Sequence, residues 1–467
     1  MSRLNRRHVL GGGLAAALAP AFAPRLTLAR EGDVQVLTAA PATAPLGAPE
    51  LPDTGVWAYD GQVPGPLIRA TAGERVRVLL RNGLDQPTTI HWHGIRIDNA
   101  MDGVPHMTQH PAPPGGEFLY DFVAPDAGTF WYHPHSSAWE QVARGLYGPL
   151  IVDPPGGPEA PRELVAMVDD WRLTEDGQIH ESFGSGHDAS HAGRLGNWLT
   201  VNGRSSPGYP ARPGETLRLR LISPANARIM SFDFAGFAPL LLALDAAALD
   251  APEPVDGPVA LAPGQRADLW LTMPDAPGVA LVHEVSTGEP TDAFAFEIAG
   301  DPAAAAAPPP LMPWGQRAPD LSAARVAMLR MEGGAMRWLA QAEHKGEVLD
   351  GRALAERGQF WAFNGVADMP PEPLITLRRG ETAILAMRND TRWRHAMHLH
   401  GMHFRVVARN GAETLEPWRD TVLMQPGEAI DAAFSADNPG DWMLHCHMLS
   451  HAESGMHTWI RILPDPV

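Results

Sequence analysis

The residues with the clearest chemical potential lie in the last forty positions of the chain. The only cysteine, Cys446, stands between His445 and His447, and His451 and Met456 follow it. Successive side chains of a β-strand point to opposite faces, so a strand here would turn both flanking histidines one way and Cys446 the other. A thiolate with imidazoles and a weak axial thioether is the ligand set of a blue copper site. The pattern therefore predicts a redox protein in which a few covalent bonds join two metal centres.

Four His-x-His pairs form the second chemical pattern. They are His91/His93, His133/His135, His398/His400 and His445/His447, and their four motifs hold ten of the 20 histidines. On a strand, each pair projects to one face, so the four pairs can converge where two domains meet. Eight imidazoles suit several borderline metal ions. Zinc is the simpler alternative, but zinc sites seldom need eight histidines and a separate thiolate centre.

His395 extends the thiolate site. It lies three residues before His398, and this odd spacing places it on the opposite face of a continuous strand from His398 and His400. That is the face expected for Cys446. His395, Cys446 and His451 then form a trigonal His2Cys set with Met456 as the axial ligand.

The elements that carry these residues belong to an internal repeat. Near residues 63, 201 and 363, a turn and a Gly-Glu pair (Gly73, Gly214 and Gly380 with their following glutamates) lead into alternating apolar residues, which predicts a half-buried strand. We expect an all-β fold of three cupredoxin-like Greek-key β-sandwich domains. Their predicted ranges are residues 30–155, 160–305 and 320–467, separated by linkers rich in Pro, Gly and Ala at 153–161 and 301–320. The first and third domains carry the His-x-His pairs, and the second carries none.

Composition fits a turn-rich β protein and narrows the partners. The 467 residues include 46 Gly and 46 Pro, and one cysteine cannot form an intrachain disulfide. The formal net charge of −18 argues against nucleic acid as a partner and is compatible with cationic substrates. No segment after the leader is long and apolar enough to predict a membrane span.

The first 29 residues read as a targeting segment. Arg6 and Arg7 precede an apolar run from Val9 to Ala23, and Thr27-Leu28-Ala29 offers a cleavage site. A twin arginine before a weakly apolar run favours the bacterial route that exports folded, cofactor-loaded proteins, and an ordinary secretory signal is the alternative. We therefore expect a periplasmic protein.

These motifs resemble those of the multicopper oxidase family, in its three-domain, bacterial laccase-like type. The matching stretches are His-Trp-His-Gly from His91, Trp-Tyr-His-Pro-His from Trp131, His-Ala-Met-His-Leu-His-Gly from His395 and His-Cys-His-Met-Leu-Ser-His-Ala-Glu-Ser-Gly-Met from His445. The resemblance implies four coppers per chain. It assigns the type 1 copper to His395, Cys446, His451 and Met456, the type 2 copper to His91 and His398, and the type 3 pair to His93, His133, His135, His400, His445 and His447.

The resemblance also implies the reaction. A reducing substrate gives single electrons to the type 1 site through whichever edge of His395 or His451 reaches the surface, and Cys446 passes them towards dioxygen, which is reduced to water. Proton delivery needs carboxylates. Asp102 occupies a place where the family carries an acid, and Glu453 is a weaker candidate because Ala452 stands where many bacterial members have the acid.

The donor is the least determined feature. Phenols and aromatic amines are our first prediction, and a metal ion, Cu(I), Fe(II) or Mn(II), is the alternative. A metal-free scaffold and a copper nitrite reductase are rival readings, which would leave many of the twelve ligand residues without a use. We read seven of the ten remaining histidines as loop or surface residues: His106, His110, His180, His187, His191, His344 and His457. A labile copper site is a further hypothesis for His180, His187 and His191.

Overall fold

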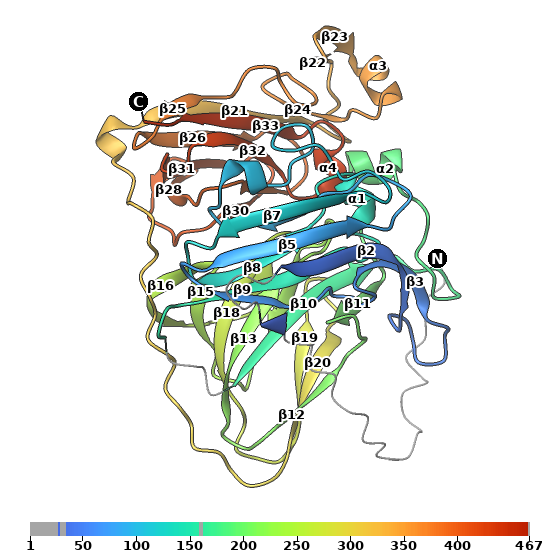
Figure 1. The fold of residues 1–467 in the computed structure, drawn as a ribbon, viewed down its shortest axis with the longest axis vertical. Helices are drawn as coiled ribbons and strands as arrows, with labels where there is room; N and C mark the ends of the chain where they lie inside the picture. The colour runs from blue at the N-terminus through green and yellow to red at the C-terminus, as the bar shows by residue number, and fades with distance from the viewer. Residues whose placement is uncertain (1–26, 29–33, 158–161, 466–467) are drawn as a thin grey trace.

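A computed structural model describes residues 27–28, 34–157 and 162–465, and these are built almost entirely of strands. The predicted leader, residues 1–29, lies outside this part except for Thr27 and Leu28, which form β1 beside β4. Sheets fall into successive pairs along the chain, which Figure 1 shows as blue to cyan, green to yellow, and orange to red layers. This confirms the expected all-β fold of three sandwich units.

The first unit packs a four-stranded sheet on a five-stranded one. The first sheet has the order β3 (Thr54–Tyr59), β2 (Gln35–Ala44), β5 (Arg75–Asn82), β7 (Glu117–Val123). The second has the order β1 (Thr27–Leu28), β4 (Ile68–Thr71), β9 (Gly148–Asp153), β8 (Gly128–His133), β6 (His91–His93). The short helices η1 (Asn99–Met101) and α1 (Ala138–Gln141) lie in its loops.

The second unit follows the same plan. Its six-stranded sheet has the order β11 (Trp198–Val201), β10 (Glu163–Trp171), β13 (Thr216–Ile222), β18 (Arg266–Thr272), β15 (Leu240–Leu244), β16 (Ala247–Pro254). Its five-stranded sheet has the order β12 (Gly208–Ala211), β20 (Thr291–Ile298), β19 (Gly278–Glu284), β14 (Met230–Asp233), β17 (Val259–Leu261). The helix α2 (Gly186–Ser190) is one of its loops, and Figure 1 shows it next to α4 of the third unit.

The third unit carries most of the predicted ligands. One sheet has the order β24 (Trp361–Phe363), β21 (Arg325–Gly333), β26 (Thr382–Asn389), β31 (Ala429–Ser435), β28 (Arg405–Arg409), β29 (Ala412–Glu413). The other has the order β25 (Thr376–Arg378), β33 (His457–Leu463), β32 (Gly440–Cys446), β27 (His395–Leu399), β30 (Thr421–Met424). The remaining elements are the hairpin β22 (Gln341–His344) and β23 (Glu347–Asp350) with η2 (Leu321–Ala323), α3 (Gly351–Glu356) and α4 (Leu449–Ala452).

The internal repeat corresponds to one structural position in each unit. The strands that follow the three Gly-Glu turns are β5, β13 and β26, and each pairs in parallel with the first long strand of its unit, β2, β10 or β21. In β5 and β26, buried residues alternate with less buried ones, as predicted for a half-buried strand. β13 is buried along nearly its whole length.

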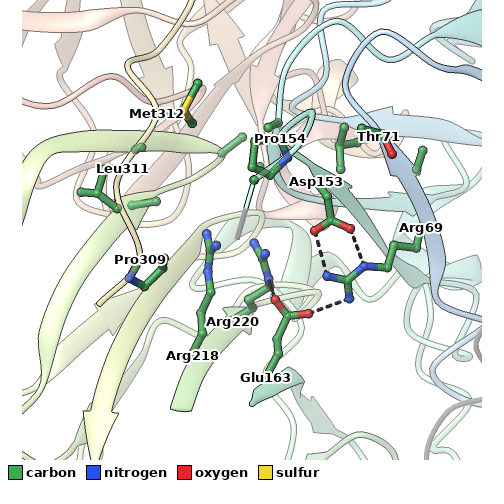
Figure 2. A pocket seen from close by; sticks show the side chains of 18 of the residues that line it. Arg69, Thr71, Asp153, Pro154, Glu163, Arg218, Arg220, Pro309, Leu311 and Met312 are labelled. Carbon is green, nitrogen blue, oxygen red and sulfur yellow. Dashed lines mark hydrogen bonds and ion pairs between the residues drawn. The ribbon is translucent and has the colours of Figure 1, made fainter. Parts of the chain in front are cut away.

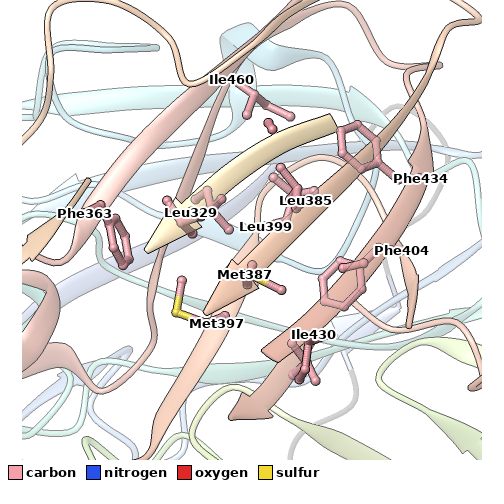
Figure 3. Packing of buried hydrophobic residues seen from close by; sticks show 14 of the residues in the cluster. Leu329, Phe363, Leu385, Met387, Met397, Leu399, Phe404, Ile430, Phe434 and Ile460 are labelled. Carbon is pink, nitrogen blue, oxygen red and sulfur yellow. The ribbon is translucent and has the colours of Figure 1, made fainter. Parts of the chain in front are cut away.

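The core of the third unit fixes the two sheets that hold the ligand strands. Figure 3 shows Leu329, Leu385 and Phe434 of one sheet close to Leu399 and Ile460 of the other, and all five are buried. Burial of such a side chain contributes about 1.5–3 kcal/mol. The apolar faces therefore fix the position of β27 against the rest of the unit.

Charged residues, by contrast, line the seam between the first and second units. A cavity of about 690 Å³ lies there, and Figure 2 shows its ion pairs. Arg69 donates to Asp153 at 2.6 and 2.8 Å and to Glu163 at 2.8 Å, and Arg220 donates to Glu163 at 2.6 Å. Each cation faces a carboxylate, so we read this cavity as a polar seam.

None of the helices in the described part of the chain has the length and apolar character that a bilayer crossing requires.

Candidate metal centres

The pairing of β27 with β32 decides which way the ligands point. Met397 lies opposite Cys446, and His398 lies opposite His445. Residues directly opposite each other in an antiparallel pair share a face, and faces alternate along each strand. His395 and Cys446 therefore share one face, and His398 and His445 share the other. The face assignment predicted from the spacing is confirmed.

On the first face, two imidazoles and the thiol meet. Cys446 Sγ lies 3.6 Å from His395 Nδ1 and 3.8 Å from His451 Nδ1, and these two nitrogens are 3.2 Å apart. Met456 is fully buried in the same apolar cluster, and its carbonyl accepts the Cys446 N–H at 3.0 Å. The three converging atoms and the buried thioether have the chemistry of a trigonal copper site.

Burial decides the protonation of this group. Burial raises the pKa of the Cys446 thiol to about 12 and lowers the pKa of His451 to about 4. The imidazoles are therefore neutral and free to coordinate, whereas the thiol becomes a thiolate only when a cation binds. The site thus suits a soft metal ion.

Neither histidine of this group reaches the surface, contrary to our expectation. His395 and His451 each have 0% exposure. His395 Nε2 lies 2.8 Å from the buried Thr391 hydroxyl, and His451 Nε2 donates to the carbonyl of His191 at 2.7 Å. The loop around α2, from the second unit, covers the edge that the sequence suggested would be open.

On the opposite face, the eight paired histidines converge as predicted. Their ligand nitrogens form sets within 4.8 Å of one another: His93 with His133 and His447, His135 with His400 and His445, and His91 with His93 and His398. The rings of His93 and His398 are stacked at 3.8 Å, so the sets adjoin. The first and third units each supply four of these residues.

The hydrogen bonds of the rings leave nitrogens aimed at this cluster. Nδ1 donates to a backbone carbonyl in His91 (2.8 Å, Asp102), His133 (2.9 Å, Pro134) and His398 (3.1 Å, Asp420). Their buried Nε2 atoms have no hydrogen-bond partner among the described residues. Burial also lowers the pKa of His133 and His398, so both are neutral. Buried, unpartnered imidazole nitrogens held by second contacts are what metal ligation requires, and the residues fit copper.

The two predicted acids differ in position. Asp102 is buried, and its Oδ2 accepts from His400 Nδ1 at 2.9 Å while its carbonyl accepts from His91. Glu453 instead lines a cavity of about 660 Å³ that reaches His135 and His445. Asp102 therefore orients two ligands from different sets, His400 and His91. Glu453 instead faces the cavity that reaches the set containing His135 and His445.

Another buried carboxylate beside the cluster, Asp420, was missed by sequence reasoning. It lies 3.2 Å from His93 Nε2 and 3.4 Å from His398 Nδ1, and it accepts from Arg266 at 2.6 and 2.9 Å. Burial alone would raise the pKa of Asp420, but Arg266 and His93 outweigh it and hold that pKa well below the usual range. No sequence motif marks Asp420 or Arg266, because they meet only in the folded chain.

Arg266 also links the three units. It belongs to β18 of the second unit, and its Nε donates to the carbonyl of Thr129 in the first unit at 3.1 Å. Nearby, Gly264 has a φ of +85°, and a Cβ there would lie 3.0 Å from atoms of His447 and His93. The second unit therefore closes the histidine cluster without supplying a ligand.

Two histidines depart from the loop or surface reading. His344 is buried, and His457 is largely buried with its Nε2 2.8 Å from Asp368. His187 and His191 lie together at α2, with stacked rings 4.1 Å apart. Among the described residues, no group of three or more possible metal ligands joins His180 to this pair.

Comparisons with known proteins agree with this geometry. Residues 46–157 and 343–466 each match a family model described as multicopper oxidase. The chain is 31% identical to the multicopper oxidase MmcO of Mycobacterium tuberculosis, over 90% of this chain and 85% of that protein. It is 28% identical to laccase-2 of Cryptococcus neoformans, over 91% and 84%. The crystal structure of a multi-copper oxidase from Pseudomonas thermotolerans superposes with a TM-score of 0.81 at 32% identity, covering 92% of this chain and 99% of that one.

Proposed function

The chain belongs to the multicopper oxidase family, and from this premise we propose that it couples the one-electron oxidation of phenols or aromatic amines to the four-electron reduction of dioxygen to water. The observation that carries the proposal is Cys446, which groups with His395 and His451 while its neighbours His445 and His447 belong to the two sets assigned below to the type 3 pair. A covalent path of a few bonds from the Cys446 group to each of these sets serves electron transfer.

We assign the predicted ligands to four coppers. His395, Cys446, His451 and Met456 would hold the type 1 ion, His91 and His398 the type 2 ion, and the two sets of three histidines the type 3 pair; those sets are His93, His133, His447 and His135, His400, His445. Bound copper supplies the one-electron chemistry and the dioxygen reduction, and the protein fixes geometry, potential and access.

We propose that the two acids supply protons for dioxygen reduction. Asp102 contacts His400 and His91, and Glu453 lines the solvent cavity beside His135. We propose that Asp102 holds and transfers protons at the cluster, and that Glu453 receives them from the cavity.

The remaining proposals concern the whole chain. We propose that residues 1–29 direct export by the twin-arginine route to the periplasm, where copper is inserted or retained. We also propose domain limits at 30–155, 160–305 and 320–467. They are supported by the polar seam between the first two units and by the strand-free segment from Ala299 to Asp320 before the third, which Figure 1 shows as a long connection.

A metal ion is the second candidate donor. The observation that favours it is the histidine pair His187 and His191, because the His191 carbonyl accepts a hydrogen bond from His451. Phenols remain first because the family relatives include laccases.

Copper analysis with an optical spectrum and oxygen uptake tests the proposal. We expect four coppers per chain, an intense blue absorption and oxygen uptake with a phenol. A copper-supplied protein that binds no copper and consumes no oxygen would support a metal-free scaffold instead. Nitrite reduction without a type 3 pair would support the nitrite reductase reading.

A further inference from the structure

The His2Cys group has no exposed histidine edge, so a donor must act through a residue that covers it. His395 contacts Thr391, which is itself buried. His451 contacts the carbonyl of His191, a half-buried residue at the end of α2. His191 therefore connects this group to the surface through a single hydrogen bond.

His191 forms a pair with His187, four positions earlier. Residues at this spacing lie on one face of a helical turn, and two histidines so placed can chelate one metal ion. The rings are stacked, with centroids 4.1 Å apart and planes 11° apart, and the His187 side chain is 76% exposed. His191 Nδ1 donates to the His187 carbonyl at 3.0 Å, so Nε2 is the ring nitrogen left for a metal.

Neighbouring contacts fix this pair over His451. Trp361 donates to the Ala189 carbonyl at 2.6 Å, and its ring lies 4.5 Å from that of His451. Ala335 N donates to the Ser190 carbonyl at 2.7 Å, which brings the loop of the exposed Met336 alongside α2.

The chemistry of the surroundings selects the ion. Mn(II) favours carboxylate oxygens, and typical Fe(II) sites join two histidines with a carboxylate, but Asp188, the acid within this turn, accepts from Arg172 at 2.6 and 3.0 Å. Two imidazoles, with a thioether on the adjacent loop, suit Cu(I).

We propose that His187 and His191 form a docking site for cuprous ions, which donate electrons through the hydrogen bond from His451 to the His191 carbonyl. Each docked Cu(I) loses one electron and leaves as Cu(II). Four such electrons and four protons convert one dioxygen into two waters. The inference rests on the proposed function and adds a second donor class to it.

Direct binding tests the site without relying on turnover. The copper-loaded enzyme is reduced under anaerobic conditions and titrated with Cu(I) against a colorimetric Cu(I) chelator. We expect the wild type to retain one Cu(I) per chain beyond its resident copper, and His187→Ala and His191→Ala to lose it. His191→Ala keeps the backbone carbonyl that contacts His451. His180→Ala removes an exposed histidine of the same region and should retain the extra ion.

Oxygen uptake gives the second readout. In both alanine variants, the ratio of uptake supported by Cu(I) to uptake supported by a phenol should fall about tenfold or more, the usual effect of losing a metal-binding contact. An extra Cu(I) that persists in both variants, or an unchanged ratio, would overturn the docking site and leave the oxidase proposal intact. A wild-type enzyme that consumes no oxygen with either Cu(I) or a phenol would instead refute the proposed function.

Discussion

Replacement of Arg266 by methionine tests whether one guanidinium holds the three units together at the cluster. Arg266 and Asp420 both have 0% exposure, and two hydrogen bonds of 2.6 and 2.9 Å join them. Arg266→Met leaves Asp420 as an uncompensated buried charge, a change that costs about 3–5 kcal/mol. The Thr129 carbonyl also loses its donor. At roughly 2–4 °C per kcal/mol for a unit of this size, we expect the unfolding midpoint to fall by about 10 °C.

Calorimetry of the copper-free protein at pH 7 measures this change without interference from bound metal. Arg75→Met is the matched control, because Arg75 pairs with Asp121 through two hydrogen bonds of 2.5 and 3.1 Å on the surface. Exposed pairs contribute little, so this control should unfold close to the wild type. Arg266→Met/Asp420→Asn removes the stranded charge and should recover part of the loss. If Arg266→Met unfolds with the control, the reasoning about this ion pair is wrong.

Three further predictions address other parts of the molecule. Cys446→Ser should abolish the blue absorption and the oxidase turnover, and a blue variant would refute the ligand role of Cys446. Gly264→Ala adds a Cβ 3.0 Å from His447 at a positive φ and should lower the copper retained per chain, as measured by metal analysis. Burial, with Asp170 nearby, raises the pKa of Asp169 from an ordinary value of about 4 to about 8, so its ionisation destabilises the fold increasingly as pH rises between these values. Asp169→Asn should therefore raise the thermal midpoint more at pH 8 than at pH 5, and an equal gain at both would contradict this assignment.

Local spacing explains why much of the site was predictable. Alternation along a strand fixes which of His395, His398 and Cys446 share a face, and the register of β27 with β32 follows that rule. The three Gly-Glu turns likewise marked equivalent strands, because each precedes the strand that pairs in parallel with the first long strand of its unit.

Contacts between distant segments were not predictable in this way. Arg266 and Asp420 are 154 positions apart, and neither belongs to a recurring motif. The covering of His451 depends on a backbone carbonyl 260 positions away, a group that every residue possesses and that carries no sequence signal. The expected exposure of a histidine edge was wrong for this reason.

The second unit shows why a domain without ligands belongs to the metal site. Histidines from two units can form one cluster only if the two units keep a fixed separation, since ligation geometry tolerates errors of about 0.5 Å. Arg266 bonds to both neighbours, and Gly264 leaves room for His447 against the same turn. On the far side, the α2 loop covers His451 and determines which donors reach it. The ligand-free second unit therefore fixes the geometry of the histidine cluster and covers the His2Cys group. Substitutions near Arg266 should alter copper retention, and substitutions in the α2 loop should alter donor choice.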